Sequence, residues 1–79
     1  MTTVDYPRFT IETYRPNGAL LGRRTFTVSG SLRSELPWAV SCAVRECRDA
    51  HGFTPTVRLL EHRGSARVDV TALWGGAWA

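Results

Sequence analysis

Residues with reactive side chains are few in this 79-residue sequence, and Cys47 and His51 come closest to a catalytic arrangement. Because they are four positions apart, a helix would bring their side chains into contact. A reactive thiolate is favoured at the N-terminus of a helix or beside a cation. Cys47 falls near the C-terminal end of the expected helix, where the helix dipole opposes a negative charge. We therefore interpret Cys47 as a buried structural cysteine and Cys42 as a residue at the edge of the core.

The sequence contains no pattern typical of a metal, cofactor or phosphate-loop site. Cys47, His51 and His62 give at most three zinc ligands, without the paired spacing of structural zinc sites. The glycine pair at 75–76 is followed by neither a lysine nor a helix, unlike a phosphate-binding loop. We expect a protein that is not an enzyme and that binds no metal or cofactor.

The basic residues are all arginines, ten against seven acidic residues, so the formal net charge is +3. This charge permits binding of a nucleic acid or an acidic partner without requiring it. We attribute the absence of lysine to the base composition of a GC-rich genome. The arginines expected to contact a nucleic acid lie on the helix and the sheet: Arg23, Arg24, Arg33, Arg45, Arg48 and Arg67. Acidic residues interrupt the helical arginines, so nucleic-acid binding is the alternative function.

A first β-hairpin is predicted by alternating apolar and polar residues, with strands at about 8–15 and 20–29. The sequence Pro16-Asn17-Gly18 between them is a strong turn signal. With residues 16–19 as the loop, the facing pairs are Phe9–Phe26, Thr10–Thr25, Ile11–Arg24, Glu12–Arg23, Tyr14–Leu21 and Arg15–Leu20. An aromatic pair on one face and an ion pair on the other favour this register.

A helix is expected at about 35–51, with Ser34 as its N-cap and Gly52 just beyond its end. Pro37 then falls in the first turn, where its missing N–H is tolerated. Apolar residues at helical spacing predict the buried stripe: Leu36, Val40, Ala43, Val44 and Cys47. Trp38 lies beside this stripe, and we expect it to cover one edge of the core.

A second hairpin is predicted with strands at about 56–62 and 65–74 and the turn at Arg63-Gly64. The facing pairs are then His62–Ser65, Leu59–Val68, Arg58–Asp69 and Val57–Val70. Trp74 ends the last strand on the core side, and residues 75–79 form a flexible tail.

These elements predict one α+β domain over residues 1–79, in the order ββαββ. Two hairpins form a four-stranded antiparallel sheet with the helix packed on one face. Side chains facing the helix are Phe9, Ile11, Phe26, Val28, Val57, Leu59, Val68 and Val70. The strand order between the hairpins stays open, and so does exchange of a hairpin between two chains. Without an apolar run of ~18 residues or a signal peptide, and with two reduced cysteines, we expect a cytoplasmic protein.

The sheet face away from the helix is expected to expose large apolar side chains, namely Tyr14, Leu21, Leu60 and Leu73. Such patches tend to mark interaction surfaces. Trp78 follows two glycines and could act as a tethered anchor for a partner. The sequence therefore predicts a small non-enzymatic interaction or regulatory module that binds a protein partner or a second copy of itself. Its small size suggests an accessory protein encoded by a phage or a plasmid.

Overall fold

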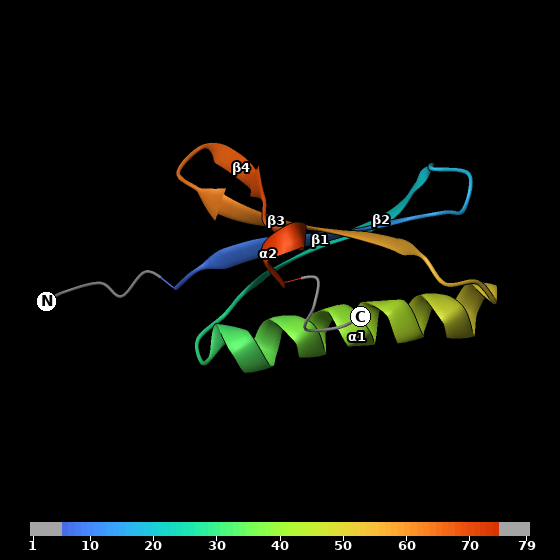
Figure 1. Cartoon of the computed structure of the whole chain (residues 1–79), viewed down its shortest axis with the longest axis horizontal. Helices are drawn as coiled ribbons and strands as arrows, with labels where there is room; N and C mark the ends of the chain where they lie inside the picture. Colours follow the sequence, from blue (N-terminus) through green and yellow to red (C-terminus); the bar gives the residue numbers. More distant parts are fainter. Residues whose placement is uncertain (1–5, 75–79) are drawn as a thin grey trace, which may run out of the picture.

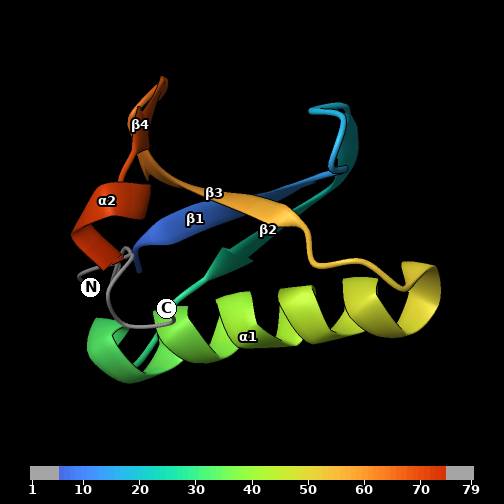
Figure 2. The ribbon, with the colours of Figure 1, turned by 45° about the vertical axis from the view of Figure 1, so that its right-hand side comes forward.

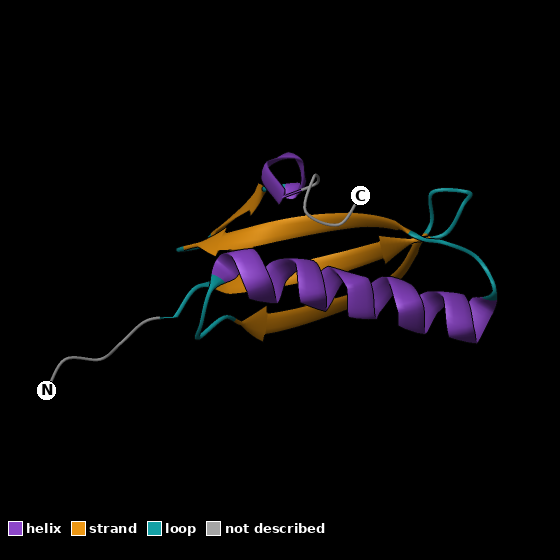
Figure 3. Cartoon of the chain, turned by 60° about the horizontal axis from the view of Figure 1, so that its bottom comes forward, coloured by secondary structure: helices purple, strands orange, loops and turns teal. Residues whose placement is uncertain are grey.

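A computed structural model describes residues 6–74, which form a four-stranded sheet with one long helix along one of its faces (Figure 1). The elements are β1 (Arg8–Tyr14), β2 (Leu20–Thr27), α1 (Leu32–His51), β3 (Thr56–Arg63), β4 (Ala66–Asp69) and α2 (Thr71–Trp74). All strand pairs are antiparallel, and the order in the sheet is β2-β1-β3-β4. Figure 3 shows the strands as one layer with α1 running across it. This confirms the predicted ββαββ fold and settles the strand order, with β1 and β3 at the centre.

The first hairpin has the predicted register over most of its length, since Phe9 faces Phe26 and Glu12 faces Arg23. Near the turn, however, Tyr14 pairs with Leu20 and a β-bulge leaves Leu21 outside the ladder. The predicted pairs Tyr14–Leu21 and Arg15–Leu20 are therefore wrong. The N–H of Arg15 donates to the carbonyl of Ala19, 2.8 Å away, and this bond closes the loop. As a result, β2 has one residue more than β1 next to the turn, and this extra residue is Leu21.

The second hairpin is displaced by two residues from the predicted register. Arg63 pairs with Ala66 and Leu60 with Asp69, so the loop is Gly64-Ser65 instead of Arg63-Gly64. Gly64 has φ +59°, and a type II′ turn places glycine at the first loop position for this reason. The predicted loop would have placed Arg63 there, at a steric cost. A shift of two residues leaves every side chain on its predicted face.

The last strand ends at Asp69 instead of residue 74, and residues 71–74 form one helical turn, α2. The carboxylate of Asp69 accepts a hydrogen bond from the N–H of Thr71 (2.9 Å) and so favours helical over extended backbone there. The Thr71 hydroxyl also accepts from the N–H of Leu59 (2.8 Å). Trp74 is therefore not a strand residue. Its side chain and the predicted tail lie outside the described residues.

Helix α1 begins at Leu32, three residues before the predicted start, with Ser31 in place of Ser34 as the N-cap. The carboxylate of Glu35 reaches back and accepts from the N–H of Gly30 (2.6 Å), which fixes the entering chain. Pro37 therefore lies in the second turn, not the first. The helix ends as predicted, because Gly52 takes φ +77° and its N–H bonds to the carbonyl of Arg48.

The core lies between α1 and the sheet and is built from the predicted apolar side chains. Its fully buried residues are Phe9, Ile11, Val28, Leu36, Val40, Leu59 and Val70. Cys47 is buried beside them, while Phe26, Val57 and Val68 are partly buried against the cluster. Trp38 is 69 % exposed, so the expectation that it covers the edge of the core is wrong. Neither described helix is long and apolar enough to cross a membrane.

Candidate functional site

The outer face, by which we mean the side of the sheet opposite α1, carries alternate residues of each strand. Their direction follows from Phe9, Ile11 and Leu59, which point into the core. The main residues of this face are Arg8, Thr10, Glu12 and Tyr14 on β1, Arg23 and Thr25 on β2, Arg58, Leu60 and His62 on β3, and Arg67 and Asp69 on β4. Both hairpin tips bend away from α1, so the face is concave (Figure 2). A hollow of ≈ 360 Å³ opens on it between Arg23 and Arg67.

Of the four residues predicted as an apolar patch, the three whose side chains are described are not brought together. Tyr14 and Leu60 are half-buried on the outer face, and polar side chains surround both. Leu21, displaced by the bulge, lines a separate hollow between β2 and α1 together with Cys47. The side chain of Leu73 and the whole of Trp78 lie outside the described residues. The exposed surface of the outer face is therefore mainly polar.

The arginines predicted to contact a nucleic acid are divided between the two sides of the domain. Arg23 and Arg67 lie on the outer face, whereas Arg24 lies on the helix side and pairs with Glu46 of α1 (Nη2–Oε2 3.0 Å). The other three are exposed on α1: Arg33, Arg45 and Arg48. One flat ligand could therefore not contact all six.

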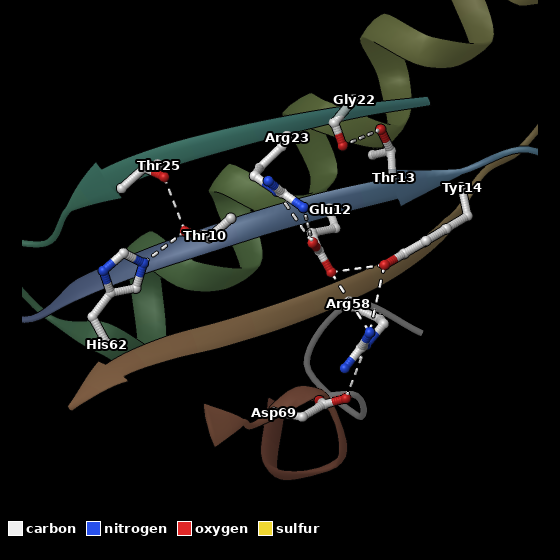
Figure 4. A network of polar contacts seen from close by, with 10 residues as sticks. All are labelled: Thr10, Glu12, Thr13, Tyr14, Gly22, Arg23, Thr25, Arg58, His62 and Asp69. Atoms are coloured by element: carbon white, nitrogen blue, oxygen red, sulfur yellow. Dashed lines mark hydrogen bonds and ion pairs between the residues drawn. The ribbon is translucent and has the colours of Figure 1, made fainter. Parts of the chain in front are cut away.

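Glu12 is the centre of a polar network on the outer face (Figure 4). Its Oε1 accepts from the hydroxyl of Tyr14 at 2.7 Å, and its Oε2 accepts from Arg23 Nη2 at 3.0 Å. Arg58 lies between two carboxylates, 3.7 Å from Glu12 and 3.2 Å from Asp69. The hydrogen bond from Tyr14 is the largest cause lowering the pKa of Glu12. The two arginines add to it, and desolvation opposes them.

His62 belongs to a second chain of hydrogen bonds on the same face (Figure 4). Its Nε2 is 2.7 Å from the hydroxyl oxygen of Thr10, which is 2.9 Å from that of Thr25. Thr10 is only 4 % exposed, so these bonds satisfy a hydroxyl that is almost fully buried. The pKa of His62 is lowered by desolvation first, and then by the positive charges of Arg67 and Arg8.

Arg8, His62 and Arg67 form a row of basic side chains across three strands, which we call the basic row. His62 and Arg67 are direct cross-strand partners, and one step beyond the pair Phe9–Glu61 places Arg8 beside His62. Within the described residues, neither Arg8 nor Arg67 makes an ion pair with a carboxylate. Like charges on neighbouring strands are destabilising. The basic row is therefore the strongest uncompensated charge on the outer face.

Three basic residues of this face were not singled out from the sequence as site residues: Arg8, Arg58 and His62. Alternation along each strand could have placed all three on the outer face. What it could not provide was the pairing of β1 with β3, because those strands belong to different hairpins. Without that pairing, Arg8 and His62 are unrelated positions.

Among residues 6–74, no three His, Cys, Asp or Glu side chains lie close enough together to hold a metal ion. Cys42 and Cys47 are both free thiols. No protein-family model, no curated protein and no solved structure matches this chain. The outer face is therefore the feature of the molecule from which its function is inferred.

Proposed function

We propose that this protein is a small non-enzymatic binding module whose outer face binds the sugar–phosphate backbone of a nucleic acid. The observation that carries the proposal is the basic row, where Arg8 and Arg67 flank His62 and neither arginine pairs with a carboxylate of residues 6–74. An arrangement that weakens the free fold is understandable if a ligand supplies the missing negative charge. Phosphate groups provide this charge and match the planar guanidinium fork of arginine.

The charge of the outer face extends beyond the basic row. Arg23 and Arg58 belong to the Glu12 network, yet their side chains are 59 % and 48 % exposed. Four arginines against Glu12 and Asp69 leave the face with a net charge of two positive units at neutral pH. This face therefore attracts anions. The two carboxylates balance only two of its four arginine charges.

The spacing of these arginines favours a polymer over a small anion. Arg8 and Glu12 are four residues apart on β1, which corresponds to about 13 Å along an extended strand. An anion that contacts both the basic row and the exposed arginines beside Glu12 must span that distance. A nucleic-acid strand advances about 3.4 Å per phosphate along the helix axis, so a few consecutive phosphates are enough. The concave shape in Figure 2 suits an elongated ligand.

The test is fluorescence anisotropy with labelled mixed-sequence duplex DNA, single-stranded DNA and RNA at ~50 and ~200 mM salt. Two uncompensated charges predict a roughly tenfold loss of duplex affinity over that range. Arg67→Ala should weaken binding and lower the log–log salt slope by about one. Arg24→Ala is the matched control, because Arg24 lies on the helix side and already pairs with Glu46.

Four outcomes would contradict the proposal. Absence of binding to all three nucleic acids at low salt would remove the ligand class. Equal weakening by Arg67→Ala and Arg24→Ala would remove the outer face as the interface. A loss of affinity only in the double variant Arg45→Ala/Arg48→Ala would move the interface to α1. Poly-glutamate is tested in the same assay. If poly-glutamate binds more tightly than any nucleic acid, the partner is an acidic protein surface instead.

Protein binding is the second candidate, and the exposure of Trp38 favours it. Tryptophan is enriched at the centres of protein interfaces, and this side chain is 69 % exposed on α1. Leu60 on the outer face could serve a second copy of the chain in the same way. Sedimentation at high micromolar concentration tests self-association. A monomer that is unchanged by Leu60→Asp or Trp38→Ser would exclude a homodimer through either residue.

A further inference from the structure

We propose that the basic row holds one phosphate group of the bound strand, and that His62 takes up a proton from solvent when it binds. This inference rests on the proposed function, because it assigns a specific role to part of the same face. It adds a property that charge alone does not predict, namely that affinity for a phosphate backbone rises as the pH falls.

The strand pairing brings the three basic side chains to one place. Directly opposed residues on neighbouring strands have Cβ atoms about 5 Å apart, so Arg8, His62 and Arg67 occupy a span of about 10 Å. His62 and Arg67 line the hollow of the outer face, and both also line an adjoining open hollow with Arg8 and Arg63. A phosphate seated over His62 is therefore within reach of the guanidinium group on either side.

The charged groups around His62 disfavour a positive charge on its ring in the free protein. From β1 it meets the Arg8 guanidinium and the Thr10 hydroxyl, and from β4 it meets Arg67. The nearest carboxylates are already occupied. Glu61 also lines the adjoining open hollow, but its carboxylate is paired with Arg63. Glu12 lies further along the outer face and is paired with Arg23 and Arg58.

The ring is held so that one nitrogen can face a ligand. Nε2 is bonded to Thr10, while within the described residues Nδ1 makes no hydrogen bond (Figure 4). A neutral ring that carries its hydrogen on Nε2 presents a lone pair at Nδ1, which repels an anion. Adding a proton at Nδ1 converts the same nitrogen into a charged donor. The bond to Thr10 is kept, so no rearrangement of the side chain is required.

A bound phosphate reverses the electrostatics that keep His62 neutral. Its negative charge offsets Arg8 and Arg67, and therefore raises the pKa of His62 in the complex above that in the free protein. Because the complex then binds more protons than the free protein, affinity increases as the pH falls between these two pKa values. A difference of about one unit between them corresponds to a tenfold gain in affinity.

The experiment measures oligonucleotide affinity at about pH 8 and about pH 5.5, a range in which phosphodiesters keep a constant charge and free histidine titrates. The expected result is several-fold tighter binding at the lower pH. His62→Gln should lose most of this gain, whatever its affinity at the higher pH, because glutamine does not titrate in this range. His51→Gln is the matched control, because His51 stacks on Phe53 at the far end of α1 and should leave the gain unchanged.

NMR of the His62 ring separates the failure of this inference from that of the proposed function. Inorganic sulfate, whose charge is constant over the same range, should raise the pKa of the ring in the native chain. Oligonucleotide binding that is independent of pH, or a gain that survives in His62→Gln, would overturn the inference and leave the proposed function intact. Sulfate that shifts the ring without any oligonucleotide binding would support the anion site and overturn the nucleic-acid proposal.

Discussion

Replacing Glu12 by glutamine tests the polar network that holds the outer face together. Glu12 is 5 % exposed and accepts hydrogen bonds from Tyr14 and Arg23, with Arg58 3.7 Å away. Hydrogen bonds to charged groups contribute about 1.5–3 kcal/mol each. Both arginines are about half exposed, so water screens them, and glutamine keeps part of the bonding. We expect Glu12→Gln to lower the free energy of unfolding by about 1–2 kcal/mol, which is about 5–15 °C in Tm for a domain of this size.

The loss in Glu12→Gln should depend on pH in a defined direction. Because the pKa of Glu12 is lowered in the folded protein, its contribution is fully present above the ordinary value of 4.5. It disappears as the pH falls through the lowered folded value, where the native carboxyl also becomes neutral. The difference in unfolding free energy between the two chains is therefore largest at neutral pH and closes in acid.

Urea unfolding followed by far-ultraviolet circular dichroism measures this difference at neutral and acidic pH. Glu46→Gln is the control, because the pair Glu46–Arg24 is 61 % exposed on both sides and should contribute less than about 0.5 kcal/mol. The reasoning is refuted if Glu12→Gln and Glu46→Gln cost the same at neutral pH. It is also refuted if the cost of Glu12→Gln is undiminished in acid.

Three further predictions follow from the structure. Leu36→Ala should cost about 2–5 kcal/mol in urea unfolding, because Leu36 is fully buried, whereas Trp38→Ala should change stability by less than about 0.5 kcal/mol. Gly64→Ala should cost about 1 kcal/mol through its φ of +59° alone, since a Cβ there meets no atom within 4 Å, and thermal unfolding measures this. The free protein should lose stability as the pH falls below about 6.5 through the lowered pKa of His62, and urea unfolding of His62→Gln should show a weaker loss over that interval.

The first hairpin could be predicted almost to the residue because its two faces give independent signals. Phe9–Phe26 and Glu12–Arg23 agree on a single register, and a one-residue slip would break both pairs. The bulge at Leu21 could not be foreseen, because it depends on how the loop closes between Arg15 and Ala19.

The second hairpin shows why the same reasoning can be wrong by two residues. Such a shift keeps Leu59 and Val68 on the core face, so the apolar pattern cannot detect it. The ion pair Arg58–Asp69 also forms in the actual register, although the two residues are diagonal neighbours instead of direct partners. Turn geometry was the deciding signal, since Gly64 suits the first loop position and Arg63 does not.

The candidate site was only partly predictable for a related reason. Alternation identifies the residues of each outer face separately, but the basic row exists only where β1 lies beside β3. That contact joins residues about fifty positions apart, and no local pattern encodes it. Tyr14, Leu21 and Leu60 do not form one apolar patch, because Leu21 is displaced by the bulge while Tyr14 and Leu60 lie among polar and charged neighbours.

The central position of β1 also affects how the chain folds while it is being synthesised. Once β1 and β2 have emerged, the inner edge of β1 must wait for β3, which follows the end of β2 by roughly 30–36 residues, or about 2–7 seconds at ordinary rates of translation. During that time its unpaired N–H and C=O groups are a template for strands of other nascent chains. The same Arg8 and Glu12 that shape the outer face place opposite charges along this strand. These charges disfavour pairing of the strand with other nascent chains during that interval.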